Sequence, residues 1–340
     1  MKKLLNILLA LLMLVSICAC TDQPADEGRV YHIGICNYVD DASLNQIVAS
    51  ITARLDELDN GRDFRFDVRV DNCNADTTVL NQIIANFLAD NVDLMVAVAT
   101  PVASVMKGAT EENGVPVIFA AVSDPVGAGL VDSLEHPGAN VSGTSDYLDT
   151  GAMLDLMFLL DPDLDKVGLL YDISQESSTA AIREAKEYLN NKGVTIIEKT
   201  GTNSTEISLA ADELIASGVR TIFTPSDNTV MAAELSIYEK IAQAGIRHYA
   251  GADSFALNSA FLGYGVDYAN LGVNTADMIY EALVSGADLS SLAVRTFDNG
   301  TATINTDTCR VLGLNYDDVA ALFGPHCTKV VPIETAEEFQ

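Results

Sequence analysis

The folded part of the chain begins with the apolar run VYHIGIC at residues 30–36, and a run of the same character, KVGLLYD, occurs at residues 166–172. After each run, helical segments alternate with short segments rich in β-branched residues. This rhythm is typical of βαβ units, which build a mostly parallel sheet. Because the rhythm starts a second time, we expect a duplicated architecture. The sequence therefore predicts an α/β fold of two doubly wound parallel-sheet lobes.

The alternation places the expected elements as follows. In the first lobe we expect strands at 30–36, 64–70, 94–99 and 115–120 and helices at 41–58, 76–88 and 102–110. In the second lobe we expect strands starting at 166 and at 194–198, 221–224 and 248–251, with helices at 176–190, 205–216 and 229–244. Doubly wound sheets bind ligands beyond the carboxyl ends of their strands, so the segments that follow the strands are the candidates for a site.

The composition narrows the class of protein. A chain of 340 residues has room for two domains, and 49% hydrophobic residues supply two packed cores, which excludes a disordered chain. There are 19 Lys and Arg against 48 Asp and Glu, a formal net charge of −29. A surface this acidic repels phosphate backbones, and the sequence shows no local basic patch. We therefore expect no nucleic-acid partner.

The first twenty residues, MKKLLNILLALLMLVSICAC, have the features of a secretory signal peptide over residues 1–19. Their end resembles a bacterial lipobox, which predicts lipidation of Cys20. The alternative is an ordinary cleaved signal with an incidental cysteine. Residues 20–28 are polar and acidic, as expected of a tether, and no later segment has 18 consecutive apolar residues. We expect an exported protein, lipid-anchored to the outer face of the bacterial cytoplasmic membrane.

Four more cysteines, an even number in an exported chain, allow two disulfides: Cys36, Cys73, Cys309 and Cys327. We favour a bridge between Cys309 and Cys327. Cys36 and Cys73 follow neighbouring predicted strands, so they form either a second bridge or a pair of buried thiols. The sequence has no closely spaced Cys and His ligands, and we expect neither a metal nor a cofactor.

Polar residues follow several of the predicted strands: Thr100-Pro101, Ser123-Asp124-Pro125, Ser226-Asp227-Asn228 and Asp253-Ser254. Helix capping alone is the ordinary explanation of such residues. Here they recur at equivalent strand ends of two lobes, where helix N-termini would converge on one cleft and attract an anion. The aspartates among them would neutralise a cation. This mixture predicts a zwitterionic amino acid as the ligand.

The motifs resemble the substrate-binding lipoproteins of ABC importers, in their tryptophan-binding subfamily. The resemblance covers residues 29–314 and is carried, in order, by AVATP (97–101), VIFAAVSDPVGAGLV (117–131), PGANVSGTSD (137–146), TPSDNTV (224–230), GADSF (251–255) and YGVDY (264–268). It implies the fold of type I periplasmic binding proteins, in which three crossing segments join two lobes that close on the ligand by a hinge.

Applied to this chain, the resemblance implies crossings near 143–147, 264–267 and 291–295. Lobe 1 then comprises 29–145 plus 266–291, with a helix at 270–283, and lobe 2 comprises 146–265 plus 292–325. We expect residues 294–305 to form a hairpin that turns at 298–300. Residues 326–340 are expected to be a C-terminal tail.

The resemblance also implies the ligand contacts. They are Thr100, Ser123 and Asp124 from lobe 1, Ser145 and Asp146 at the hinge, and Ser226, Asp227, Asn228 and Asp253 from lobe 2. Tyr264 is a contact or a hinge residue, and Tyr38 lies where an aromatic ligand would stack. The family's first strand often ends in an aromatic residue and an acidic His-Pro segment, whereas this chain continues as Cys36-Asn-Tyr-Val-Asp-Asp. This departure leaves the identity of the ligand open.

The predicted function is the capture of an aromatic amino acid such as tryptophan by a monomer, followed by delivery to an ABC permease. Branched-chain amino acids and other small amphipathic solutes remain alternatives, as does a ligand-sensing lipoprotein that reports to a receptor. Catalysis is not expected. The sequence lacks G-x-S-x-G, a Walker A loop, H-E-x-x-H, and G-x-G-x-x-G after the first strand.

Replacement of Cys20 by Ser removes the thiol that would carry the lipid, so we expect the protein to move from the membrane to the soluble fraction. Fractionation of cells that produce each form measures this. Retention of the Cys20→Ser protein on membranes would contradict lipidation at this position.

Overall fold

The computed structural model describes residues 28–336. The expected signal peptide, the expected lipidation site Cys20, most of the expected tether and residues 337–340 lie outside this range. Within it, none of the helices has the length and apolar character needed to span a membrane.

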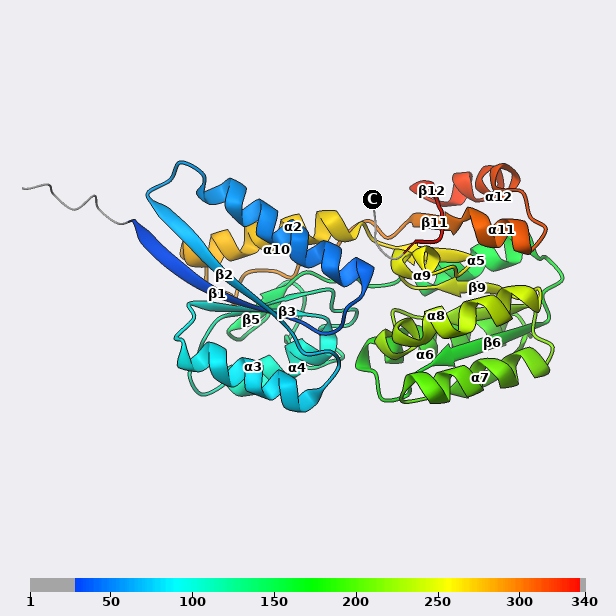
Figure 1. Ribbon diagram of the computed structural model, residues 1–340, viewed down its shortest axis with the longest axis horizontal. Helices are drawn as coiled ribbons and strands as arrows, with labels where there is room; N and C mark the ends of the chain where they lie inside the picture. Colours follow the sequence, from blue (N-terminus) through cyan, green and yellow to red (C-terminus); the bar gives the residue numbers. More distant parts are fainter. Residues whose placement is uncertain (1–27, 337–340) are drawn as a thin grey trace, which may run out of the picture.

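Two sheets lie one beyond the other along the long axis of the molecule (Figure 1). The first sheet is wholly parallel and has the strand order β2-β1-β3-β4-β5. Its half of the chain contains β1 (Arg29–Asn37), α2 (Ala42–Asp59), β2 (Phe64–Asn72), α3 (Thr77–Ala89), β3 (Leu94–Val98), α4 (Thr100–Thr110), β4 (Val117–Ala120) and β5 (Val141–Gly143).

The second sheet has the order β12-β11-β10-β9-β8-β6-β7. Its strands and their helices are α5 (Thr150–Leu160), β6 (Lys166–Tyr171), α6 (Glu176–Asn191), β7 (Thr195–Thr200), α7 (Ser204–Ala216), β8 (Thr221–Thr224), α8 (Asn228–Gln243), β9 (Arg247–Ala250), α9 (Asp253–Leu257) and β10 (Leu262–Gly265). The remaining elements are α10 (Tyr268–Leu283), β11 (Thr301–Asn305), α11 (Thr306–Val311), α12 (Tyr316–Phe323), a 3₁₀ turn (Gly324–His326) and β12 (Lys329–Ile333).

The internal repeat is visible in both topology and packing. The order β7-β6-β8-β9-β10 of the second sheet reproduces the order β2-β1-β3-β4-β5 of the first. Gly34 in β1 lies under α3, where an added Cβ would meet the Phe87 ring at 2.7 Å. Gly168 in β6 lies under α7, where a Cβ would meet Leu214 at 3.0 Å. The prediction of two doubly wound lobes is confirmed.

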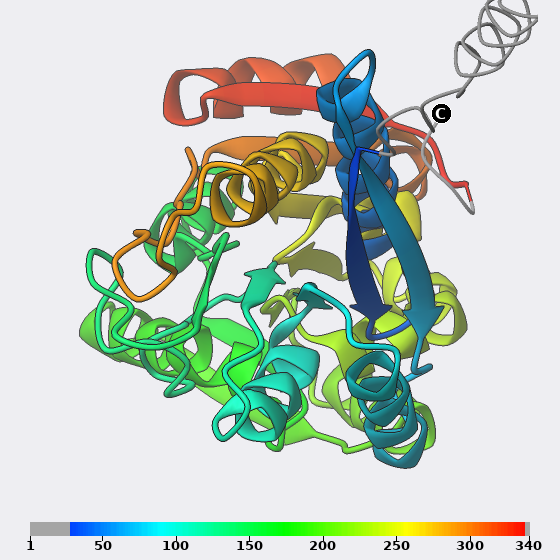
Figure 2. The same ribbon diagram turned by 90° about the vertical axis from the view of Figure 1, so that its left-hand side faces the viewer.

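The central strands of the first sheet divide their side chains between two helical layers. Ile33 and Ile35 of β1 share a core with α2 and α10, whereas Cys36 shares one with α3 and α4. Figure 2 shows these helix pairs on opposite sides of the sheet. Because both faces are covered, β3 is buried along its whole length.

Three connections join the lobes. They run from β5 to α5, from β10 to α10, and from α10 to β11. The first and third are held together by backbone hydrogen bonds, from Arg295 N to Gly143 O at 2.9 Å and from Ser145 N to Arg295 O at 2.9 Å. Helix α10 packs against α2 of the first lobe (Figure 1). The chain therefore crosses between the sheets at one hinge region.

The expected hairpin at 294–305 is wrong. Arg295 bridges to Thr144 beside the first sheet, and residues 301–305 alone form a strand of the second sheet, antiparallel to β10. The expected C-terminal tail is also corrected, because it contains β12, which pairs with β11 as the edge strand. That strand includes Pro332, which an edge position tolerates because no neighbour requires its missing N–H.

All four described cysteines are thiols, so neither expected disulfide is formed in this structure. Cys309 and Cys327 pack into the second core as small apolar side chains. Cys36 and Cys73 are both buried, and the Cys73 thiol donates to Tyr38 O at 3.2 Å. The neighbouring Cys73 thiol and burial raise the pKa of Cys36.

Replacing Gly34 by Ala should lower the free energy of unfolding by about 1–3 kcal/mol, because the added methyl group overpacks the Phe87 ring. Gly108→Ala is the matched control. Gly108 lies in α4 with no atom near its Cβ position, so this change should stabilise by about 0.5–1 kcal/mol. Urea unfolding measures both values. Equal stabilities of the two variants would refute the packing of α3 on Gly34.

Candidate functional site

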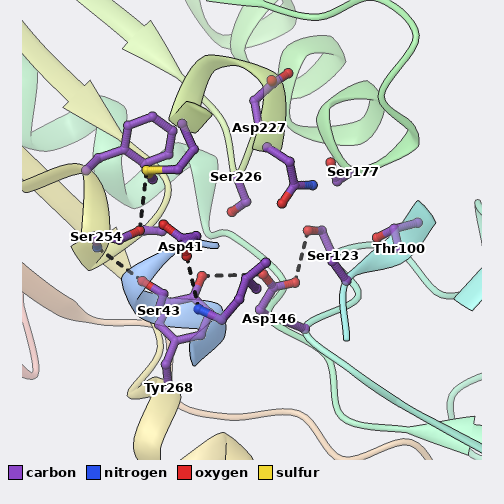
Figure 3. A pocket seen from close by; sticks show the side chains of 17 residues that line it. Asp41, Ser43, Thr100, Ser123, Asp146, Ser177, Ser226, Asp227, Ser254 and Tyr268 are labelled. Atoms are coloured by element: carbon purple, nitrogen blue, oxygen red, sulfur yellow. Dashed lines mark hydrogen bonds between the residues drawn. The ribbon is translucent and has the colours of Figure 1, made fainter. Parts of the chain in front are cut away.

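A cavity lies between the lobes, at the carboxyl ends of strands from both sheets (Figure 3). Its wall is formed by the starts of α2, α4, α6, α8, α9 and α10 and by the segments after β4 and β5. The lining residues are Asp41, Ser43, Leu44, Ala99, Thr100, Ala121, Ser123, Asp146, Ser177, Ser226, Asp227, Asn228, Met231, Ala252, Ser254, Phe255 and Tyr268. The convergence expected from the strand ends is therefore present.

The cavity is narrow because the lobes lie close together. Its volume is about 30 Å³. Ligand entry thus requires the lobes to separate.

Three of the helices that reach the cavity, α4, α6 and α9, have no side-chain cap. Helix α4 begins at Thr100 after Ala99, which has φ 78° and ψ 154°, and α6 begins after Gln175. An alanine with this positive φ is strained, so the backbone is held there by its surroundings. In contrast, Asp41 caps α2 and Asp227 caps α8. The N–H groups at the uncapped helix starts, with the positive end of each helix dipole, favour an anion.

Three buried polar atoms that line the cavity have no hydrogen-bond partner within residues 28–336. They are Thr100 Oγ1 and Ser177 Oγ, which can donate, and Asp41 Oδ2, which can accept. An unpaired buried polar group costs about 1–3 kcal/mol, and native proteins rarely leave one without a reason. The cavity thus presents both free donors and a free acceptor.

The acceptor side of the cavity carries negative charge. Asp146 Oδ1 accepts a hydrogen bond from Ser123 Oγ at 2.9 Å, and its Oδ2 lies 3.4 Å from the Tyr268 hydroxyl. Burial raises the pKa of both Asp41 and Asp146 above the ordinary value for aspartate. Burial, with the nearby carboxylates, also raises the pKa of Tyr268 well above its usual value. A cation placed here would relieve the cost of keeping these carboxylates ionised.

The structure brings six of the predicted site residues to this cavity: Thr100, Ser123, Asp146, Ser226, Asp227 and Asn228. Asp227 has little capacity left for a ligand. Its Oδ1 caps α8, and its Oδ2 accepts from Asp172 N at 2.8 Å and Ser178 Oγ at 2.6 Å. Burial raises the pKa of Asp227 to about 6. Its main role is to hold the start of α8 in place.

Two predicted contacts lie elsewhere in the cleft. Asp124 and Ser145 line a neighbouring cavity of about 650 Å³ beside the hinge, which meets the first at Ser123. Asp124 Oδ1 accepts from Gly127 N at 2.8 Å within its own turn. The sequence correctly placed this turn after β4, but successive residues of a turn point in different directions.

Three further predicted contacts do not line the cavity. Asp253 is half-buried and accepts a hydrogen bond from Ser43 Oγ at 2.6 Å. Tyr264 is buried in the second core, where its hydroxyl donates to Asn299 O at 3.1 Å. Tyr38 packs beside the first core and lies against Gln175 of the other lobe. Their placement on strand ends was expected, whereas the side to which each side chain points was not.

Five polar residues of the cavity were not predicted as ligand contacts, although Ser254 was among the polar residues expected after the strands: Asp41, Ser43, Ser177, Ser254 and Tyr268. Asp41 and Ser43 follow β1, and Ser177 follows β6. Polar residues after these two strands were a signal of the same kind as Thr100 and Ser226. Ser254 and Tyr268 lie inside the motifs GADSF and YGVDY.

Comparisons with known proteins agree with this architecture. Residues 32–322 match the family model described as "ABC transporter substrate binding protein". The chain is 30% identical to the "Tyrosine-binding protein" of Clostridioides difficile (strain R20291), over 92% of this chain and 93% of that protein.

Two solved structures share the fold at similar identity. The ABC domain from Streptococcus pneumonia in complex with L-Trp gives a TM-score of 0.80 at 27% identity, covering 88% of this chain and 99% of that one. The ligand-free, open structure of a substrate-binding protein with adhesive properties from Clostridium difficile gives 0.67 at 28% identity, covering 90% and 100%. The chain belongs to the ABC transporter substrate-binding protein family.

Proposed function

We propose that the protein captures a free aromatic amino acid as its zwitterion and delivers it to an ABC import permease. The observation that carries this proposal is the set of unpaired buried atoms in one cavity between the lobes: Thr100 Oγ1, Ser177 Oγ and Asp41 Oδ2. Donors alone would suit an anion and carboxylates alone would suit a cation. Both together suit a molecule that carries the two charges close to each other.

The α-carboxylate is assigned to the donor side. Thr100 and Ser177 offer hydroxyl groups, and each stands in the first turn of a helix without a side-chain cap. The α-ammonium is assigned to Asp41 and Asp146, whose negative charges face the same space. Each charge-assisted hydrogen bond contributes about 1.5–3 kcal/mol, so a few of them bring a small ligand to micromolar affinity.

The side chain is assigned to the apolar part of the wall. Leu44, Met231 and Phe255 line the cavity together with Tyr268. These residues present apolar surface, an aromatic ring and a polarizable sulfur, which suit a planar aromatic group. The names of the two relatives, one tyrosine-binding and one with L-Trp bound, support an aromatic amino acid over a branched-chain one.

The ligand binds non-covalently, and the protein then releases it to the permease of an importer. Membership of the substrate-binding family supports this delivery step. The protein would act as a monomer held at the outer face of the membrane by lipid on Cys20, with no cofactor. Its acidic surface would favour basic docking patches on the permease.

Thermal-shift and calorimetric titration with a matched series of compounds tests the proposal. The protein is first unfolded and refolded to remove any bound cargo. L-tyrosine, L-tryptophan and L-phenylalanine are compared with tyramine, which lacks the carboxylate, and with 3-(4-hydroxyphenyl)propionate, which lacks the ammonium. We expect binding by at least one aromatic amino acid and at least tenfold weaker binding of both truncated compounds. Equal binding of tyramine and tyrosine would refute the assigned carboxylate grip.

Ligand affinity should fall as the pH is lowered below neutrality. Burial raises the pKa of Asp146 and Asp41 in the free site, and an ammonium group favours their ionised forms. Ligand binding therefore releases protons, so acid opposes it. Asp146→Asn should weaken binding about tenfold or more at pH 8 and flatten the pH dependence. Asp90→Asn, on the exposed surface of lobe 1, serves as the control. An unchanged pH profile in Asp146→Asn would contradict this role.

A further inference from the structure

The lobes are joined across the cleft by direct hydrogen bonds. Ser43 Oγ, in α2 of lobe 1, donates to Asp253 Oδ1 at 2.6 Å. It also accepts from Ser254 N at 3.1 Å, as Figure 3 shows. Both partners stand at the start of α9 in lobe 2. At the exposed rim, Ser104 Oγ of α4 donates to Glu176 Oε2 of α6 at 2.9 Å.

The Ser43 hydroxyl is committed to the other lobe although it lines the ligand cavity. The side chain is 1% exposed, and its single hydroxyl hydrogen points to Asp253. It therefore has no hydrogen left to donate to a ligand. This separates Ser43 from Thr100 and Ser177, whose hydroxyls have no partner in the described chain.

The Asp253 carboxylate depends on that hydrogen bond while the cleft is closed. Burial raises the pKa of Asp253 to about 7, the nearby Asp41 charge acts in the same direction, and the hydrogen bond from Ser43 opposes both. Opening of the cleft would return the carboxylate to water. Without Ser43 the closed form would hold this partly buried carboxylate with no side-chain donor, and the open form would be favoured.

We propose that Ser43, Asp253 and the start of α9 form a latch that holds the lobes together with or without ligand and so limits how fast ligand enters and leaves. The expected effect of the latch on the rates of ligand binding and release rests on the proposed function. Its expected effect on the ratio of closed to open forms does not. The rim pair Ser104–Glu176 contributes little, because exposed polar pairs compete with water.

Matched variants separate the latch from other roles. Ser43→Ala and Asp253→Ala remove the bond, whereas Asp253→Asn keeps an oxygen that accepts from Ser43. Ser104→Ala removes the hydrogen bond to Glu176 at the rim of the cleft. Ser236→Ala is the control, because Ser236 Oγ bonds Ala233 O within α8.

The first measurement is the separation of the lobes in refolded, ligand-free protein, from spectroscopic labels on Asp56→Cys and Glu187→Cys, two exposed positions in different lobes. The parent protein, in which Ser43 and Asp253 are both present, should be mainly in the closed form. Ser43→Ala and Asp253→Ala should lower the ratio of closed to open forms at least tenfold, and the other three variants should leave it nearly unchanged. A ligand-free parent protein that is mainly open, or lobes unaffected by Ser43→Ala, would overturn the latch.

The second measurement is stopped-flow binding of L-tyrosine or of whichever aromatic amino acid binds best. Both entry and exit require opening, so loss of the latch should raise the association and dissociation rates together. If Ser43 only contacted the ligand, Ser43→Ala would raise the dissociation rate and leave the association rate unchanged. That result would also overturn the proposal. Failure of every amino acid to bind would refute the proposed function, and the lobe separation would still decide the latch.

Discussion

The carboxyl ends of the parallel strands of two sheets face each other across one cleft, and this arrangement constrains most of the polar chemistry of the protein. Most of these strand ends lead into a helix, such as α4 after β3 and α8 after β8, whose first N–H groups have no partner inside the helix. When the lobes close, these groups and the side chains beside them lose contact with water. Every one of them must then find a partner in its own lobe, in the other lobe or in a ligand.

The cleft uses all three kinds of partner. Asp227 finds its hydrogen-bond partners in its own lobe, where it caps α8 and accepts from the segment after β6. Ser43 and Asp253 satisfy each other across the cleft. Thr100, Ser177 and Asp41 keep an unpaired atom each, and these atoms are left for a ligand. Serine, threonine and aspartate side chains thus stabilise one lobe, hold the two lobes together or remain available to a ligand. Only the partner of each side chain distinguishes these roles.

Much of the fold could be predicted from local patterns. Buried strands such as LMVAV at 94–98 read as continuous apolar runs because helices cover both faces of the sheet. The glycines of the two leading strands stood out because a helix packs on each of them. The C-terminal strand β12 was missed, since a short edge strand with a proline has no apolar alternation that separates it from a tail.

The candidate site was predictable in part. Thr100 and Ser226 were found because a hydroxyl residue after a strand is a local signal. Asp253 and Tyr264 were misplaced because the direction of a side chain depends on which neighbour it meets, as Asp253 meets Ser43 some 210 positions away in the chain.

The sequence by itself determined the two-lobed α/β architecture, the acidic surface and the set of strand ends that supply the cleft, because apolar periodicity, charge and helix starts are local properties. Only the tertiary structure decided which of those polar groups pair with each other and which stay free. Which polar groups pair and which stay unpaired depends on how the two lobes approach each other. A local sequence pattern contains no information on contacts between segments that are distant in the chain.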